Sequence, residues 1–150
     1  MTTLEKGDKA PCFSGKDQDG NTHKLSDYKG KKLVVFFYPK ANTPGCTTEA
    51  CDLRDNFERF QANNYDLLGV SADSAKAQGN FKNKYELPFP LLADEDKSVI
   101  QAFGVWGPKK FMGKEYDGIH RTTFVINENG IIDEVITSVK TKAHSNQILK

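Results

Sequence analysis

Two cysteines, Cys46 and Cys51, stand five positions apart at the end of the stretch FFYPKANTPGCTTEAC, residues 36–51. A cysteine thiolate is a nucleophile and is readily oxidised, so the pair is a candidate site for covalent or redox chemistry. The spacing differs from the Cys-x-x-Cys of dithiol oxidoreductases and is not a typical zinc-ligand pattern. The surrounding residues must therefore show what the pair does.

The residues before Cys46 predict a helix that begins at Pro44. Thr43 is a favoured N-cap type and proline is favoured at the first helical position, so Cys46 becomes the third residue of the helix. At that place, unpaired backbone N–H groups and the positive end of the helix dipole favour a thiolate. The hydroxyl of Thr43 can either cap the helix or hydrogen-bond the sulfur, while Pro39 offers a rigid wall without a donor.

The same helix separates the two cysteines. Apolar or small residues recur at offsets of four and three, which places the following residues on one helical face: Cys46, Ala50, Leu53, Phe57 and Phe60. Positions five apart in an α-helix have Cα atoms roughly 8 to 9 Å apart, beyond the ~7 Å limit for a disulfide. Cys46 and Cys51 therefore cannot be bonded while the helix is intact, and we interpret the pair as a switch that requires local unwinding.

Alternating strand and helix signals surround this helix. A strand that is apolar on both faces, residues 31–39, precedes it, and a second buried strand, residues 65–72, follows it, which predicts a parallel βαβ unit. The other expected elements are an N-terminal hairpin at 16–25, a helix at 73–85 capped by Asp73 or Ser74, a strand at 89–94, a helix at 95–104, two strands within 121–137 joined at Asn129-Gly130, and an amphipathic helix at 142–150. Together they predict a three-layer α/β sandwich like that of thioredoxin, with an N-terminal hairpin extension.

Composition restricts the classes of function. With 150 residues and a formal net charge of +1, the chain is expected to be a single domain, residues 1–150, without the basic surface of a nucleic-acid-binding protein. No run approaches the roughly 18 apolar residues of a membrane helix, and no secretory signal follows Met1, so we expect a soluble, cytoplasmic protein. A metal site is not expected, because none of the histidines has zinc-ligand spacing with the cysteines: His23, His120 and His144.

The residues around Cys46 also carry a resemblance to a known family. Pro39, Thr43 and Cys46 match the Pro-x-x-x-Thr/Ser-x-x-Cys signature of peroxiredoxins. The longer stretch FYPKANTPGCTTEACDLRD is similar to the bacterioferritin comigratory protein, or Q-type, branch of that family. The similarity continues through GVSADS, KYELPFPLLADED, GVWGPKKFMGKEYDGIHRTTFVI and NENGII, and so covers nearly the whole chain.

The resemblance implies a thiol-dependent peroxidase that reduces hydrogen peroxide and organic hydroperoxides without a cofactor or metal. Cys46 would be the peroxidatic cysteine, which becomes a sulfenic acid, and Thr43 and Arg121 would hydrogen-bond the sulfur and the peroxide oxygens. Pro39 would shield the pocket, and Glu49 would help to orient the arginine. Arginine suits this role better than lysine because its planar fork contacts sulfur and oxygen together.

The resemblance also bears on the second cysteine and on partners. Cys51 falls where some Q-type members carry a resolving cysteine on the same helix. The implied product is an internal Cys46–Cys51 disulfide, which thioredoxin or a similar thiol reductant would reduce. The branch further implies a monomer. A nucleic-acid or membrane partner is not expected, because the charge is balanced and no long apolar run is present.

Other interpretations remain open from the residues alone. Cys51 lies off the apolar helical face and could be an unreactive bystander. Cys12, in the segment APCF, is expected to be a structural thiol near the core, with a resolving role as the alternative. A thiol–disulfide oxidoreductase would normally carry a cysteine three positions after Cys46, where this chain has Glu49. A redox sensor or chaperone-like binding protein would oxidise Cys46 without rapid peroxide turnover.

Overall fold

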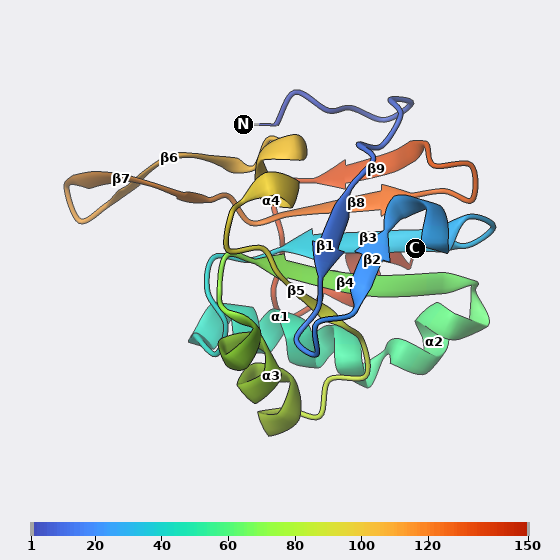
Figure 1. Ribbon diagram of the computed structural model, residues 1–150, viewed down its shortest axis with the longest axis horizontal. Coiled ribbons are helices and arrows are strands. Elements are labelled where there is room, and N and C mark those ends of the chain that lie inside the picture. The colour runs from blue at the N-terminus through green and yellow to red at the C-terminus, as the bar shows by residue number, and fades with distance from the viewer. Residues whose placement is uncertain (1, 150) are drawn as a thin grey trace.

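The computed structural model describes residues 2–149, apart from the side chain of residue 111. Its centre is a five-stranded sheet in the order β5-β4-β3-β8-β9 (Figure 1). The strands are β3 (Lys32–Phe37), β4 (Tyr65–Ser71), β5 (Leu91–Ala93), β8 (Thr122–Ile126) and β9 (Ile132–Ile136). β3 pairs with β4 in parallel and with β8 antiparallel, so the strand that leads to the cysteine pair lies in the middle of the sheet.

Both faces of this sheet are covered, as the apolar pattern of β3 predicts. Leu33, Val35 and Phe37 point into one hydrophobic cluster, whereas Val34 and Phe36 point into the other. The alternation follows from the two-residue period of a strand, and burial on both faces is typical of a central strand with parallel neighbours.

One face carries most of the helices and the other carries the N-terminal hairpin (Figure 1). The helices on the first face are α1 (Pro44–Asp55), α2 (Phe57–Ala62), α3 (Ala75–Lys84) and α5 (His144–Ile148). The opposite face is covered by β1 (Ser14–Lys16), β2 (Thr22–Lys24), the 3-10 helix η1 (Leu25–Tyr28) and α4 (Ser98–Ala102). The expected three-layer α/β sandwich with an N-terminal hairpin is therefore confirmed.

The long helix expected from Pro44 to Phe60 is interrupted. α1 ends at Asp55 and α2 begins at Phe57, with Asn56 between them at φ −109° and ψ 12°. The side-chain amide of Asn56 donates to the carbonyl of Asp52 at 2.9 Å, so it competes with the backbone for an acceptor of the helical ladder. The prediction of one continuous helix is wrong, although Phe57 and Phe60 still pack against the same cluster as α1.

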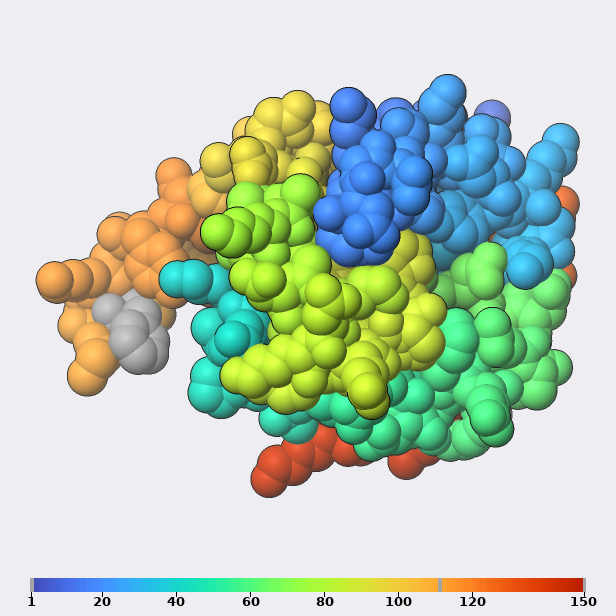
Figure 2. Space-filling model, turned by 60° about the horizontal axis from the view of Figure 1, so that its bottom comes forward, coloured from blue at the N-terminus to red at the C-terminus, as the bar shows by residue number. Residues whose placement is uncertain are grey.

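A second hairpin, formed by residues 106–119, was not predicted from the sequence. β6 (Trp106–Phe111) and β7 (Lys114–Ile119) pair antiparallel and project from the body of the molecule (Figures 1 and 2). Their residues are mostly polar or glycine, the first four residues of β7 are all exposed, and the turn is Met112-Gly113 with φ values of 52° and 82°. Methionine seldom adopts positive φ, and Met-Gly is not the Asn-Gly pair that usually marks such a turn. No signal in the sequence therefore marks this hairpin.

The remaining elements are found with shorter bounds, except that the N-terminal hairpin, expected at 16–25, begins two residues earlier, at Ser14. Ser74 is the N-cap of α3, since its hydroxyl accepts the N–H of Ala77. β8 and β9 turn at Gly130, as expected. The final helix covers His144–Ile148, and residue 150 of the expected helix lies outside the described residues. Within residues 2–149, no helix combines the length and the apolar character needed to cross a membrane.

Candidate active site

The loop between β3 and α1 is held firmly in place. Half-buried Pro39 lies in it, and Asn42 adopts a left-handed conformation with φ of 63°, which asparagine tolerates better than most residues. The N–H of Ala41 donates to Oδ2 of Asp73 at 2.7 Å, and the hydroxyl of Ser71 donates to the same oxygen at 2.6 Å. The carboxylate thus ties the start of α1 to the end of β4.

Cys46 is the third residue of α1, as predicted, and its side chain is almost fully buried. The first intrahelical bond runs from the N–H of Thr47 to the carbonyl of Thr43 at 2.8 Å. The N–H groups of Gly45 and Cys46 come before that bond and have no partner within the helix. The sulfur therefore lies at the positive end of the helix dipole, in surroundings from which water is largely excluded.

Thr43 occupies the N-cap position, but its hydroxyl neither caps the helix nor hydrogen-bonds the Cys46 sulfur, the two roles expected from the sequence. The residue is extended, with φ −94° and ψ 158°, and makes no side-chain cap. Its hydroxyl donates to the carbonyl of Lys40 at 2.8 Å. Because that proton is already engaged, the lone pairs of the oxygen can still accept a hydrogen bond from a bound molecule.

Arg121 contacts the Cys46 sulfur although the two residues are 75 positions apart in the sequence. It directly precedes β8, and its Nη2 lies 3.4 Å from Sγ of Cys46, while its Nη1 donates to Oε1 of Glu49 at 2.7 Å. Burial lowers the pKa of Arg121, but the neighbouring charges of Cys46 and Glu49 outweigh it and the pKa is raised. The guanidinium is therefore permanently charged and bridges the sulfur and the carboxyl group.

Glu49 lies one turn after Cys46 on the same helix and is fully buried. Burial raises the pKa of this carboxyl group to about 7, with Asp52 adding to the rise and Arg121 opposing it. The structure thus brings together Cys46, Glu49 and Arg121, with Thr43 and Pro39 in the loop that leads to them.

Gly45 is a site residue that the sequence did not single out. A Cβ at this position would lie 3.2 Å from Nη2 of Arg121, closer than an ordinary van der Waals contact. A side chain here would push the guanidinium away from the sulfur, so glycine permits the close approach. The Pro-Gly pair before Cys46 was the available signal.

Gly45→Ala is expected to slow the reaction of Cys46 with peroxide by roughly three- to tenfold, because a displaced guanidinium is poorly aligned with the reacting atoms. Alanine should not destabilise the helix, since it is the better helix former. The matched control is Gly79→Ala in α3, where the nearest atom, Cβ of Gln18, would be 3.9 Å away. Stopped-flow kinetics should show a slow Gly45 variant and an unaffected Gly79 variant. Equal rates for both would show that Gly45 does not serve Arg121.

The two other cysteines lie in different surroundings. Cys51 is half-buried on α1, and the helix is intact across it and Cys46, with both thiols free. Their Cα atoms are thus separated by the roughly 8 to 9 Å of five helical positions. Direct bonding would require the helix to open.

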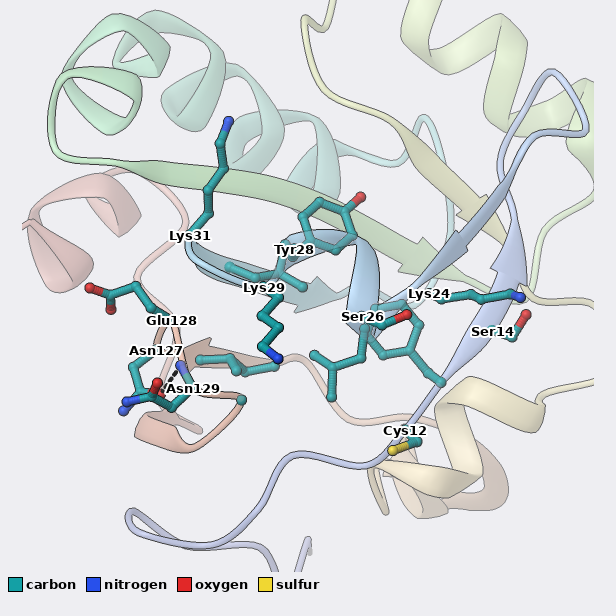
Figure 3. A pocket seen from close by; sticks show the side chains of 15 residues that line it. Cys12, Ser14, Lys24, Ser26, Tyr28, Lys29, Lys31, Asn127, Glu128 and Asn129 are labelled. Carbon is teal, nitrogen blue, oxygen red and sulfur yellow. Dashed lines mark hydrogen bonds between the residues drawn. The ribbon is translucent and has the colours of Figure 1, made fainter.

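Cys12 is exposed, so the expectation of a thiol near the core is wrong. Its neighbours Ala10 and Phe13 supply the buried contacts of this segment instead. The thiol lies at one end of a pocket of about 450 Å³, between the N-terminal segment, η1 and the β8–β9 turn (Figure 3). Leu33 and Ile126, which also line this pocket, belong to the hydrophobic cluster on the opposite face of the sheet from α1. Cys12 is therefore separated from Cys46 by the sheet.

Comparison with known proteins identifies the family. Residues 6–135 match the model of the AhpC/TSA family. Peroxiredoxin Bcp of Escherichia coli K12 is 48% identical over 149 residues, which cover 99% of this chain and 96% of that protein. The chain is a peroxiredoxin of the AhpC/TSA family. Peroxiredoxin Bcp of Bacillus subtilis is 49% identical to this peroxiredoxin over 148 residues, 99% of the chain and 94% of that protein.

Solved structures agree with this assignment. Peroxiredoxin Q of Xanthomonas campestris superposes on the peroxiredoxin with a TM-score of 0.88 at 34% identity, covering 99% of this chain and 94% of that one. A cysteine-to-serine mutant of PrxQ from Xylella fastidiosa gives a TM-score of 0.92 at 33% identity, over 99% and 95% of the two chains. The thioredoxin-like fold and the Q-type resemblance are thereby confirmed. As a peroxiredoxin, the chain is a thiol-dependent peroxidase with hydroperoxide substrates and a thiol reductant.

Proposed function

We propose that Cys46 is the peroxidatic cysteine of this peroxidase and that Arg121 is its main electrophilic partner. The observation that carries the proposal is the bridging position of Arg121, with one amino group at the Cys46 sulfur and the other at Glu49. The Cys46 thiolate attacks one peroxide oxygen, an S–O bond forms and the O–O bond breaks. The departing oxygen leaves as an alkoxide or hydroxide and takes up a proton, which leaves Cys46 as a sulfenic acid.

Charge movement in this step explains the residue types. Negative charge moves from the sulfur to the departing oxygen, so donors that span both positions stabilise the transition state. The guanidinium of Arg121 and the unpaired N–H groups at the start of α1 can supply those donors. The hydroxyl oxygen of Thr43, whose proton goes to Lys40, is free to accept the O–H of the hydroperoxide. Pro39 limits the access of water, and Glu49 orients the arginine.

We further propose that Cys51 resolves the sulfenic acid. Its thiol attacks the Cys46 sulfur, the S–S bond forms, the S–O bond breaks, and the oxygen leaves as water. Two observations support this step: both cysteines are on one helix, and Cys51 is partly accessible. Because intact helical geometry holds them beyond bonding distance, the first turns of α1 must unwind after peroxide has reacted. A thioredoxin-like dithiol would then reduce the exposed disulfide.

Cys51→Ser should react once with peroxide and then stop at the sulfenic acid of Cys46, because no second thiol on α1 can displace the oxygen. Mass spectrometry after one equivalent of hydrogen peroxide should show one added oxygen on Cys46, and excess peroxide should carry it to the sulfinic acid. The control is Cys12→Ser, which should form the internal disulfide as the wild type does. Unchanged turnover in Cys51→Ser would show that another thiol resolves Cys46.

Unwinding has its own observable. Hydrogen exchange across residues 43–53 should be slow in the reduced protein and much faster in the disulfide form, because the disulfide excludes the intact helix. The amides of β3, in the middle of the sheet, serve as the internal reference and should keep their protection. Equal protection of the α1 segment in both redox states would contradict a mechanism that opens the helix.

We propose a monomer in solution. Among the described residues, the large hydrophobic side chains that are exposed are Met112 and Tyr116, both in the β6–β7 hairpin. They are few for an obligate interface, which resembles a protein core cut in half. Light scattering of the reduced and oxidised forms should therefore give the mass of one chain.

A further inference from the structure

A buried histidine lies behind Glu49, and the mechanism above does not use it. His144 is the first residue of α5 and is fully buried. Its Nε2 lies 3.5 Å from Oε2 of Glu49, whereas the hydrogen bond from Arg121 goes to the other carboxyl oxygen, Oε1. Within the described part of the chain, that Oε2 is buried and has no hydrogen-bond partner. An unpartnered carboxyl oxygen facing an imidazole nitrogen requires an explanation, because burying such a group without a partner is costly.

Hydrogen bonds around the imidazole fix its tautomer. Nδ1 of His144 lies 2.7 Å from Oε1 of Gln147. That Oε1 also accepts the N–H of Lys140 at 2.9 Å, and the amide nitrogen of Gln147 donates to the carbonyl of Ser138 at 2.9 Å. The amide oxygen is therefore an acceptor, so Nδ1 carries a hydrogen and Nε2 is the nitrogen that titrates.

The number of protons between His144 and Glu49 then follows from their contacts. If neither Oε2 nor Nε2 carries a proton, a carboxylate oxygen faces the lone pair of Nε2. That nitrogen can then accept a hydrogen bond only from the hydroxyl of Thr123, at 2.7 Å. With two protons, a buried imidazolium faces a neutral acid close to the charged Arg121. With one proton, held on Oε2, the carboxyl O–H points toward Nε2 at 3.5 Å, whose lone pair also receives the Thr123 hydroxyl, and no negative charge is buried opposite that lone pair.

We propose that His144 is a positioning residue for the reaction at Cys46, acting through one proton that it shares with Oε2 of Glu49. The shared proton fixes the carboxyl group, whose other oxygen holds Arg121 against the sulfur. It also sets the local charge: Arg121, Glu49 and His144 together carry one net positive charge while the proton is present and none when it is lost. This inference rests on the proposed roles of Cys46 and Arg121.

Groups on every neighbouring element act on this pair. Burial lowers the pKa of His144, and the positive charge of Arg121 lowers it further. Three groups raise this pKa: Gln147, Asp52 on α1 and Glu134 on β9. Burial raises the pKa of Glu49 to about 7, Arg121 opposes the rise and Asp52 adds to it. Both net shifts favour the uncharged forms, so the shared proton resides mainly on Glu49 below about pH 7. The positive charge of Arg121 is then available to the Cys46 thiolate.

Two substitutions of His144 separate its contributions. His144→Phe keeps the flat ring but removes both nitrogens, and it should slow the oxidation of Cys46 by hydrogen peroxide by about ten- to a hundredfold. His144→Gln can donate to Oε2 but cannot titrate, so it should recover part of the rate. The control is His23→Phe, since His23 also contacts a carboxylate, Oδ2 of Asp17 at 2.7 Å, on the other face of the sheet. Its rate should stay within about twofold of the wild type.

Nitrogen chemical shifts of His144 test the shared proton directly, in the wild-type protein and in Glu49→Gln. We expect a proton on Nδ1 throughout, and an Nε2 titration that Glu49→Gln displaces. The inference is overturned by a proton fixed on Nε2, by a titration that Glu49→Gln leaves unchanged, or by a folded His144→Phe variant with the wild-type rate. If the wild type itself does not react at Cys46, or Arg121→Lys reacts normally, the proposed function fails instead. The spectra decide the matter even where His144→Phe does not fold.

Discussion

Cys46→Ser is expected to abolish peroxide consumption and to leave the fold intact. A serine hydroxyl is not ionised near neutral pH and is a far weaker nucleophile than a thiolate, so the O–O bond is not attacked. The substitution exchanges one small side chain for another at the start of α1, in a cluster whose packing depends on larger residues of the same face. Peroxide consumption with a thioredoxin system and the thermal unfolding curve should be measured together.

The control for this substitution is Cys12→Ser. Cys12→Ser should keep full turnover, because Cys12 lies on the opposite face of the sheet. If the Cys46→Ser protein, with Cys12 and Cys51 present, still consumed peroxide, the nucleophile would be one of those two residues and not Cys46.

Arg121→Lys should slow the oxidation of Cys46 by about ten- to a thousandfold. Lysine keeps the positive charge but has one ammonium group in place of a fork, so it cannot hold Glu49 and approach the sulfur at the same time. The loss belongs to the peroxide step, and the subsequent formation of the disulfide should be unaffected. The second-order rate constant with hydrogen peroxide is the measurement.

Arg59→Lys is the matched control, since Arg59 is exposed on α2 and bonds only Asn56 among the contacts described for its side chain. Its rate should equal that of the wild type. A rate for Arg121→Lys within about twofold of wild type would place Arg121 outside the reacting centre.

The parts of the fold with strong local signals were predictable. β3 combines a long apolar run with a proline stop, and Gly130 marks a turn that needs positive φ. The β6–β7 hairpin was not predictable, because its strands are largely solvated and its turn places Met112 at positive φ. The break at Asn56 was also hidden, since the apolar period continues through it while a side-chain hydrogen bond ends the helix.

The active site likewise contains residues that the sequence predicted and residues that it did not. Cys46 and Thr43 follow from local rules for the start of a helix, although those rules did not show that the Thr43 hydroxyl turns to Lys40. Arg121 is 75 positions from Cys46, so only the family resemblance connected the two in the sequence. His144 was missed because its relation to Glu49 exists only after α5 packs on α1, and nothing in the sequence pairs these residues.

Cys46 and Cys51 are expected to form the catalytic disulfide, although an intact helix separates them in the reduced protein. Intact-mass analysis with peptide mapping, after one equivalent of hydrogen peroxide, tests it most directly. The expected result is the loss of two hydrogen atoms and a single peptide pair joined through Cys46 and Cys51, with Cys12 still a free thiol. A disulfide between Cys46 and Cys12, or a stable sulfenic acid on Cys46 in the wild-type protein, would contradict it.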